Sequence, residues 1–276
     1  MKIALCQTNS GIDPAENLAA LTKMIAAATA GGAAMAFTPE MSGLLDRDGK
    51  RAAPKLASEA NDIVLAGLRQ AALAQRIWLS IGSLALTGEQ GDGRLVNRGF
   101  VIDDGGHIRA RYDKLHLFDV DLPTGESWRE SARYAPGDSA SVIETPIGVL
   151  GLSICYDLRF PALYSALSGA EATLLAVPAA FTVPTGEAHW HILLRARAIE
   201  NAAYVIAAAQ TGIHQDGRAT FGHSLVIDPW GRVILDMGDA PGVGFAEIDQ
   251  KELEKARKQI PVLDHRRVIP HVKSLS

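Results

Sequence analysis

The sequence has only two cysteines, Cys6 and Cys155, among its 276 residues. Two cysteines cannot form the disulfide framework of a small secreted protein, and their separation does not match the spacing of a metal-binding motif. We therefore expect two free thiols in a reducing, cytoplasmic setting. We also expect neither a metal ion nor a cofactor.

The sequence also lacks long apolar runs and an excess of positive charge. Its longest apolar runs, such as 172–177 and 204–209, are as long as single strands, whereas a membrane-spanning helix needs about 20 residues. Residues 2–8 predict an immediate strand and show no feature of a signal peptide. The net charge of −4 gives no electrostatic reason for nucleic-acid binding. We expect a small-molecule partner, and neither a membrane nor a nucleic acid.

Strand-like and helix-like segments alternate along the chain in two similar halves. Hydrophobic residues make up 47% and charged residues 21%, which is typical of a globular protein. The alternation favours a layered α/β fold, with two sheets covered by helices on their outer faces. We expect one domain over residues 1–260 and a polar tail over residues 261–276. The expected strands are 2–8, 33–37, 77–84, 94–102, 107–112, 141–144, 148–154, 172–177, 204–210, 222–228, 232–236 and 244–248, and the expected helices are 14–30, 58–75, 160–168, 187–201 and 251–258.

Three reactive residues, Glu40, Lys114 and Cys155, lie at the carboxyl ends of predicted strands. Ligand sites in layered α/β folds form at that edge of the sheet. Lys114 also lies at the start of a polar segment over residues 113–139 that is rich in proline, glycine and charge. A loop this long inside a domain is usually functional. The joint placement predicts that the three residues share one active site.

Each of the three residues has a plainer interpretation when it is taken alone. A cysteine at a strand end is more often a small buried hydrophobic residue, and we interpret Cys6, which lies within a strand among apolar neighbours, in that way. An isolated glutamate or lysine is usually a solvated loop charge. A cysteine nucleophile also commonly uses a histidine as its base, and His116, His189 and His223 are the candidates for such a pair.

Three sequence blocks resemble the signature blocks of the nitrilase, or carbon–nitrogen hydrolase, superfamily. They are Thr-Pro-Glu at 38–40, Tyr-Asp-Lys-Leu-His-Leu at 112–117 and Gly-Leu-Ser-Ile-Cys-Tyr-Asp at 151–157. They occur in the order of the family and with similar spacing, and the resemblance extends over about residues 1–265. It implies a four-layer αββα sandwich. It also implies a homodimer or larger homo-oligomer, in which the polar tail crosses to a partner.

The resemblance implies a role for each reactive residue. Cys155 is expected to be the nucleophile, and Glu40 the general base that takes its proton. Lys114 is expected to favour the thiolate and to stabilise the oxyanion. The backbone N–H of Tyr156 is expected to be the second oxyanion donor.

Many family members use a second glutamate in the loop after the lysine, and two residues compete for that place here. The string Ser-Trp-Arg-Glu-Ser at 127–131 is similar to the family element and favours Glu130, sixteen residues after Lys114. Its expected function is to position the lysine and the amide nitrogen of the substrate. Glu126 is then an ordinary surface glutamate.

Further segments resemble one branch of the superfamily, the Nit branch, which contains omega-amidases and deaminated-glutathione amidases. These segments are 155–161, 188–201, 222–231 and 261–267. The branch implies a thiol-dependent amidase that hydrolyses the terminal carboxamide of a small keto-acid-type substrate and releases ammonia. The stretch 211–224 favours deaminated glutathione as substrate, followed by α-ketoglutaramate.

Such substrates carry carboxylates, so the site should contain a cation besides Lys114. Arg159, four residues after the cysteine, is the first candidate, although a salt bridge across the turn is an equal alternative. The resemblance places Phe181 and Thr182 at the pocket wall. With Tyr156, these residues are the expected substrate-binding group.

Two rival functions remain open. An N-carbamoyl amino-acid amidohydrolase of the same superfamily would use the same catalytic residues, but it typically has more arginine and histidine beside the cysteine. Only Arg159 fits that pattern here, because Leu158 occupies the neighbouring position. A catalytically silent homologue that acts as a binding partner would be indicated by an absent catalytic residue, and none is absent.

Overall fold

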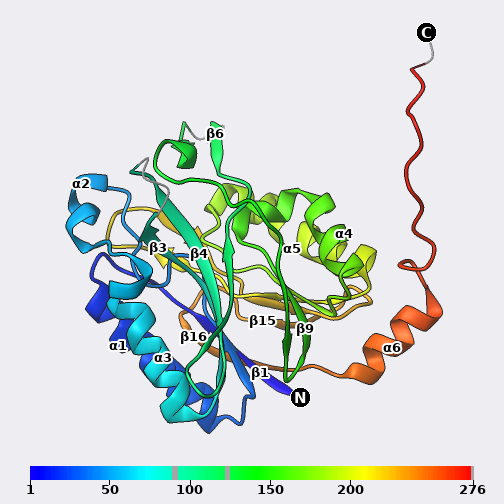
Figure 1. The fold of residues 1–276 in the computed structure, drawn as a ribbon, viewed down its shortest axis with the longest axis horizontal. Helices are drawn as coiled ribbons and strands as arrows, with labels where there is room; N and C mark the ends of the chain where they lie inside the picture. Colours follow the sequence, from blue (N-terminus) through cyan, green and yellow to red (C-terminus); the bar gives the residue numbers. More distant parts are fainter. Residues whose placement is uncertain (89–92, 122–124, 275–276) are drawn as a thin grey trace.

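Two six-stranded sheets pack face to face, and helices cover their outer faces (Figure 1). The computed structural model describes residues 1–88, 93–121 and 125–274. Among these residues, no helix is both long enough and apolar enough to span a membrane. The first sheet has the strand order β16-β1-β2-β3-β4-β5, and the second has the order β15-β14-β11-β10-β9-β8. This is the four-layer αββα sandwich that the sequence implied.

The first sheet joins strands from both ends of the chain. The short strand β2 lies parallel to β1 and β3, whereas β16 lies antiparallel to β1. Helices α1 and α3 cover the outer face of this sheet (Figure 1). The elements of this half are β1 (Lys2–Gln7), α1 (Pro14–Ala30), β2 (Met35–Phe37), α2 (Gly49–Ala52), α3 (Ile63–Gln75), β3 (Trp78–Thr87), β4 (Leu95–Ile102), β5 (Ile108–Asp113) and β16 (Gly242–Glu247).

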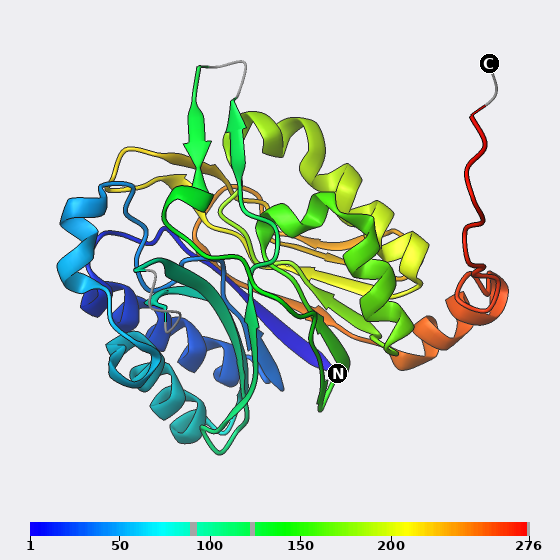
Figure 2. The same cartoon turned by 45° about the horizontal axis from the view of Figure 1, so that its top comes forward.

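The second sheet has a parallel centre, in which β10 lies between β9 and β11. Helices α4 and α5 cover its outer face, and Figure 2 shows both from above. Helix α6 leads into an extended C-terminal segment that projects away from the body (Figures 1 and 2). The elements are β8 (Val142–Thr145), β9 (Gly148–Leu152), α4 (Pro161–Gly169), β10 (Leu174–Ala176), α5 (Val183–Asn201), β11 (Tyr204–Ala207), β14 (Leu225–Ile227), β15 (Val233–Asp236) and α6 (Gln250–Gln259).

Two hairpins and four short 3₁₀ turns complete the described structure. The long segment after Lys114 contains one of these hairpins and one of these turns, so it is not wholly irregular. The hairpins are β6–β7 (Asp119–Asp121 and Ser127–Arg129) and β12–β13 (Thr211–Ile213 and Ala219–Phe221), and the turns are η1 (Ala53–Lys55), η2 (Glu59–Asn61), η3 (Glu130–Ala132) and η4 (Cys155–Arg159).

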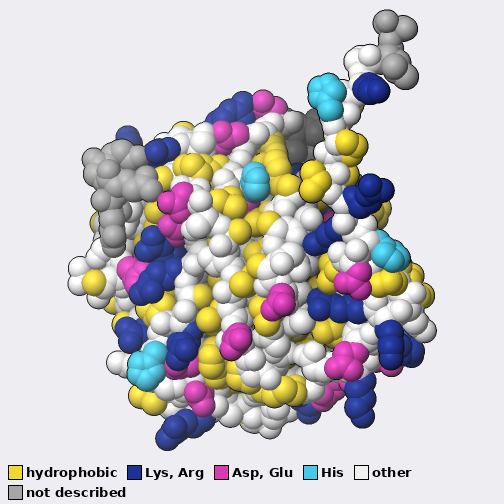
Figure 3. All heavy atoms as spheres, turned by 45° about the vertical axis from the view of Figure 1, so that its right-hand side comes forward, with side chains coloured by type: hydrophobic (Ala, Val, Ile, Leu, Met, Phe, Trp, Pro, Cys, Tyr) yellow, Lys and Arg dark blue, Asp and Glu magenta, His cyan; other side chains and the backbone are white. Residues whose placement is uncertain are grey.

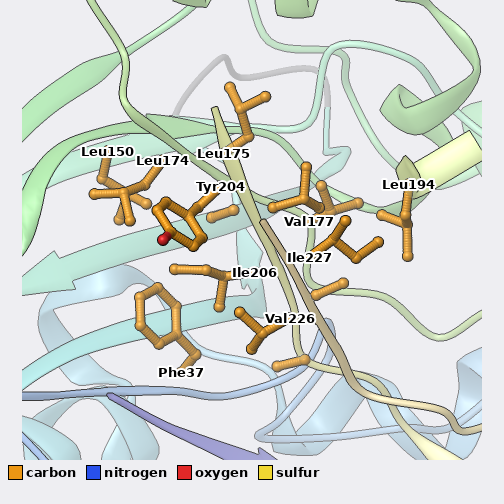
Figure 4. Close-up of a cluster of buried hydrophobic side chains, with 14 of the residues drawn as sticks. Phe37, Leu150, Leu174, Leu175, Val177, Leu194, Tyr204, Ile206, Val226 and Ile227 are labelled. Carbon is orange, nitrogen blue, oxygen red and sulfur yellow. The ribbon is translucent and has the colours of Figure 1, made fainter. Parts of the chain in front are cut away.

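The main core lies between the two sheets because side chains alternate along each strand. On β1, Ile3 and Leu5 point into the core between the sheets, whereas Ala4 points to the layer under α1 and α3. Figure 4 shows Phe37 of the first sheet facing Ile206 of the second. All of these side chains are at most 2% exposed.

Local capping sets two helix boundaries that the sequence prediction placed differently. Helix α3 begins at Ile63 and not at residue 58, because Asp62 is extended and caps the helix by accepting a hydrogen bond from the N–H of Leu65. Helix α5 begins at Val183 and not at residue 187. Pro184 lies in its first turn, where the missing N–H costs no helical hydrogen bond.

Candidate active site

Cys155 lies on a strained turn between β9 and α4. It is the first residue of η4, and its φ of +50° is a left-handed conformation that is rare for residues other than glycine. Its N–H donates to the carbonyl of Pro178 at 2.8 Å, and the residue is 7% exposed. Such strain is typical of functional sites. The other cysteine differs: Cys6 is wholly buried on β1, and burial raises its pKa to about 12.

A buried ion cluster surrounds the Lys114 side chain. Its Nζ lies 2.9 Å from Oε1 of Glu40 and 2.8 Å from Oε2 of Glu130. Glu40 follows β2, Lys114 follows β5, and Glu130 opens η3 after the β6–β7 hairpin. All three side chains are nearly inaccessible, with exposures of 2% for the lysine and 6% and 12% for the glutamates. The fold thus brings together the three charged residues that the sequence predicted to act with Cys155.

Each carboxylate of the cluster is fixed by further donors. The Cys155 thiol hydrogen-bonds to Glu40, and the N–H of Ala180 donates to Oε2 of Glu40 at 2.9 Å. The Nδ2 of Asn97 donates to Glu40 at 2.9 Å and to Glu130 at 3.2 Å. Asn97 lies within β4 and was not predicted as a site residue. Its only signal in the sequence is a polar side chain in a mostly apolar strand.

The cluster controls the protonation of its members. Burial raises the pKa of Glu40, but the charge and hydrogen bond of Lys114 and the bonds from Cys155 and Asn97 outweigh it, so that the pKa is lowered. Burial lowers the pKa of Lys114, but Glu130 and Glu40 raise it well above its usual value. Glu40 is therefore a carboxylate and Lys114 an ammonium at neutral pH.

The thiol of Cys155 is held in its neutral form. Burial, followed by the charge of Glu40, raises its pKa well above the usual value, and Lys114 lowers it only in part. Lys114 acts on the thiol in the expected direction, since its charge lowers this pKa, but burial and the charge of Glu40 outweigh it.

The buried carboxylate of Asp157 connects the nucleophile turn to β5. It accepts hydrogen bonds from the Tyr112 hydroxyl at 2.7 Å, the Ile154 N–H at 2.8 Å and the His116 N–H at 3.0 Å. The His116 ring lies 2.7 Å from the same carboxylate and stacks on Phe160. His116 is thus held by Asp157, His189 lies against Arg159 and His223 against Asp236. None of the three histidines lines the cavity described next, so the geometry offers Cys155 no histidine base.

A cavity of about 420 Å³ opens beside Cys155 and the ion cluster. Tyr156, Phe181 and Thr182 line it, as the sequence predicted, and Glu126 lies at its exposed edge. Four arginines also line it, namely Arg47, Arg129, Arg133 and Arg218.

Arg159 is not among the residues that line this cavity. Its guanidinium lies over the rings of Tyr156 at 5.9 Å and Phe181 at 5.6 Å, and it contacts His189 at 3.3 Å. Arg159 therefore contacts two side chains of the cavity wall, and its role in substrate binding stays a prediction. The salt bridge considered as its alternative is also not found among the described residues.

The cavity arginines differ in their partners. Arg129 pairs with Asp121, and Arg218 pairs with Asp216 and lies over the Trp128 ring. Within the described part of the chain, the guanidinium groups of Arg47 and Arg133 form no ion pair. Because an unpaired guanidinium can bind a carboxylate with two parallel hydrogen bonds, the cavity has cationic groups available for an anionic ligand.

This geometry agrees with the comparisons to known proteins. The family model described as "Carbon-nitrogen hydrolase" matches residues 2–258. The deaminated glutathione amidase of Bos taurus is 41% identical over 268 residues, covering 96% of this chain and 81% of the relative. The protein of the same name from Yersinia enterocolitica is 39% identical, covering 97% and 93%.

The solved structures agree as well. The crystal structure of Saccharomyces cerevisiae Nit3, described as a member of branch 10 of the nitrilase superfamily, superposes with a TM-score of 0.86 at 27% identity. The match covers 97% of both chains. The chain belongs to the carbon–nitrogen hydrolase family, in the Nit branch of the nitrilase superfamily.

The directions of these pKa shifts predict that the rate of amide hydrolysis changes little with pH near neutrality. Glu40 stays ionised below the usual carboxylate range, while Lys114 stays charged and Cys155 stays neutral above their usual ranges. We expect kcat/KM for amide hydrolysis to vary less than about twofold between roughly pH 6 and 8.5, because none of these groups titrates there. Initial rates of ammonia release across that range measure it. An acid limb near pH 6.5 would instead indicate a histidine base and contradict this assignment.

Proposed function

We propose that the protein is a thiol-dependent amidase that hydrolyses the terminal carboxamide of a small keto-acid-type anion and releases ammonia. Deaminated glutathione is the favoured substrate, followed by α-ketoglutaramate. The observation that carries the proposal is the buried Glu40–Lys114–Glu130 cluster, hydrogen-bonded to Cys155 at one end of an arginine-lined cavity. The names of the curated relatives support the substrate class.

The first half of the reaction forms a thioester. The Sγ of Cys155 attacks the amide carbon while its proton passes to the Glu40 carboxylate, to which it is already hydrogen-bonded. Because the thiol is neutral at rest, proton transfer accompanies attack and does not precede it. The negative charge that develops on the amide oxygen is stabilised by Lys114 and by the N–H of Tyr156. Tyr156 is the second residue of η4, where a backbone N–H has no helical acceptor.

The second half returns the enzyme to its starting state. Glu40 gives its proton to the departing nitrogen, the C–N bond breaks, and ammonia leaves. Glu40 then takes a proton from water while the oxygen of that water attacks the thioester carbonyl. The C–S bond breaks as Glu40 passes this proton to Sγ, which gives the product acid, the free thiol and the Glu40 carboxylate. Lys114 and Tyr156 stabilise the oxyanion in this step too.

Glu130 positions the lysine in this proposal. Its two oxygens lie 3.1 and 2.8 Å from Nζ, and one of them also accepts the N–H of Phe118 at 2.7 Å. A lysine held between two carboxylates keeps its charge and its direction. Glu130 also offers an acceptor for the substrate NH₂ group, whereas exposed Glu126 makes no comparable contact with any residue that the structure describes.

A matched pair of cysteine variants tests the chemistry. We expect Cys155→Ala to reduce ammonia release from deaminated glutathione at least about 10³-fold, because no other nucleophile is hydrogen-bonded to Glu40. We expect Cys6→Ala, which changes a buried thiol away from the cavity, to keep kcat within about threefold. The panel should also include α-ketoglutaramate, N-carbamoyl amino acids and simple nitriles.

Activity on this set of substrates distinguishes the proposed amidase from the two rival functions. The highest kcat/KM on an N-carbamoyl amino acid would favour the amidohydrolase alternative. No turnover of any of these compounds by a correctly folded chain would favour the silent binding homologue. Full activity of Cys155→Ala would overturn the thioester mechanism itself.

The unpaired arginines test the substrate class. We expect Arg47→Gln and Arg133→Gln each to raise the KM for deaminated glutathione by about 5- to 30-fold, because each loses a charge-assisted contact worth about 1–2 kcal/mol. A neutral carboxamide such as propionamide should be affected less than twofold. Arg232→Gln, an exposed arginine outside the cavity, is the control. Equal losses on charged and neutral amides would argue against carboxylate recognition.

We also propose that residues 1–260 act as one catalytic domain and that the C-terminal tail, 261–276, joins a homodimer or larger assembly. Within residues 261–274 the tail has no helix or strand, and it exposes apolar side chains at Val268, Ile269 and Val272. Figure 1 shows the tail apart from the body, and Figure 3 shows a face on which apolar side chains mix with charges. Two buried free thiols support a reducing, cytoplasmic location.

The assembly is testable by light scattering. We expect a mass of at least twice the chain mass of 29.3 kDa. The double variant Val268→Asp with Ile269→Asp should shift the protein toward the monomer, because buried carboxylates would oppose the interface. Ile213→Asp, which changes an equally exposed apolar residue outside the tail, should leave the mass unchanged. A strictly monomeric wild-type protein would remove this proposal.

A further inference from the structure

Two histidines and one aspartate converge on the outer side of the second sheet, away from Cys155. His191 lies on α5, His223 precedes β14, and Asp236 ends β15. The ligand atoms of the three side chains all lie within 4.8 Å of one another. Nothing in the proposed amidase reaction uses these residues.

The distances between these three side chains are close to those between the ligands of a single metal ion. Nε2 of His191 lies 3.0 Å from Oδ2 of Asp236, and Nδ1 of His223 lies 2.9 Å from Oδ1 of the same carboxylate. Donors around a tetrahedral zinc ion, with bonds of about 2.0–2.1 Å, lie roughly 3.3 Å apart. Small side-chain rotations therefore suffice to admit an ion between the three groups.

The backbone and neighbouring rings hold the cluster in place. His223 has a left-handed φ of +52°, its N–H donates to Gly238, and its carbonyl accepts the indole N–H of Trp190 at 2.8 Å. The ring of Phe221 stacks on His223 with centroids 4.5 Å apart and meets His191 edge-on. The Gly238 N–H also donates to Oδ1 of Asp236. Ligands that are held in this way lose little freedom when an ion binds.

We propose that His191, His223 and Asp236 form a binding site for Zn²⁺ or a similar first-row divalent ion. Imidazole nitrogens with one carboxylate are ligands that such ions prefer, and Mg²⁺ and Ca²⁺ do not favour imidazole. The side chains are 36%, 29% and 34% exposed, so an ion can reach them from solvent. The fourth position of a tetrahedron is left for water.

The site is separate from the amidase site. Thr182, which lines the cavity, caps the N-terminus of α5, and His191 lies nine residues further on, roughly 13 Å along the helix axis. An ion bound here would join α5 to β15 and to the segment before β14. We therefore expect it to stabilise the fold rather than to take part in amide hydrolysis. This proposal departs from the expectation of no metal ion, which rested on the spacing of the cysteines. The three ligands proposed here are far apart along the chain and form no sequence motif.

Zinc binding to the metal-free full-length protein tests the proposal. The Cys155→Ala variant is the background, because it removes the thiol that lines the cavity as a competing ligand. We expect isothermal titration with Zn²⁺ to give one saturable site per chain. Co²⁺ in its place should give the intense visible absorption of a four-coordinate ion. His191→Ala, His223→Ala and Asp236→Asn should each weaken binding by at least about tenfold.

The control is His189→Ala, which changes an exposed histidine on the same helix that contacts only Arg159 among the described residues. It should bind Zn²⁺ as the background does. Thermal unfolding provides the second readout: Zn²⁺ should raise the Tm of the background and of His189→Ala, but not of the three ligand variants. Absence of saturable binding, or binding that all three ligand variants retain, would overturn the proposal and leave a simple His–Asp–His hydrogen-bond bridge.

Discussion

The rest of the site depends on one buried ammonium, that of Lys114, held between two buried carboxylates. Removing the ammonium would leave two buried carboxylates uncompensated, which costs several kcal/mol. With Cys155 neutral, the cluster carries one net negative charge. Burial raises the pKa of the thiol most, and the charge of Glu40 raises it further, because a thiolate would add a second negative charge there. The proton therefore leaves the sulfur only as the new C–S bond forms.

The residues of the active site also connect the two sheets. Glu40 and Lys114 come from the ends of strands in the first sheet, and Cys155 and Ala180 follow strands of the second. Asp157 connects the same two sheets, because it accepts hydrogen bonds from the Tyr112 hydroxyl of β5 and from the N–H of Ile154, which precedes Cys155. Two sets of hydrogen bonds, one around Glu40 and one around Asp157, therefore join the two sheets beside the reactive groups.

The sequence predicted the parts of the site that are local and missed those that are not. Glu40, Lys114 and Cys155 each end a strand within a short characteristic block, so their convergence follows once the sheets are drawn. Asn97 bridges two carboxylates from within a strand, where no motif indicates it.

Proximity along the chain indicates only part of the cationic environment of the cavity. Arg159, four residues from the nucleophile, lies over the rings of Tyr156 and Phe181 in the cavity wall. The unpaired cavity arginines, Arg47 and Arg133, come from loops distant in sequence from Cys155. Tertiary packing determines which loops line a cavity, and the periodicity of the side chains does not predict that packing. Most strands of the two large sheets, by contrast, follow from periodicity, and the αββα layer order follows from the family resemblance.

The arrangement of charge along the cavity gives the proposed substrate a direction. The inner end contains the cluster with its net negative charge, and the arginines without ion pairs lie among the residues that line the rest of the cavity. A ligand with a neutral carboxamide at one end and carboxylates at the other is repelled if its carboxylates enter first and attracted if they stay outward. The same field leaves the product acid less favourable than the amide, because hydrolysis creates a new carboxylate beside Glu40. Electrostatics thus both orients the amide toward Cys155 and favours release of the product.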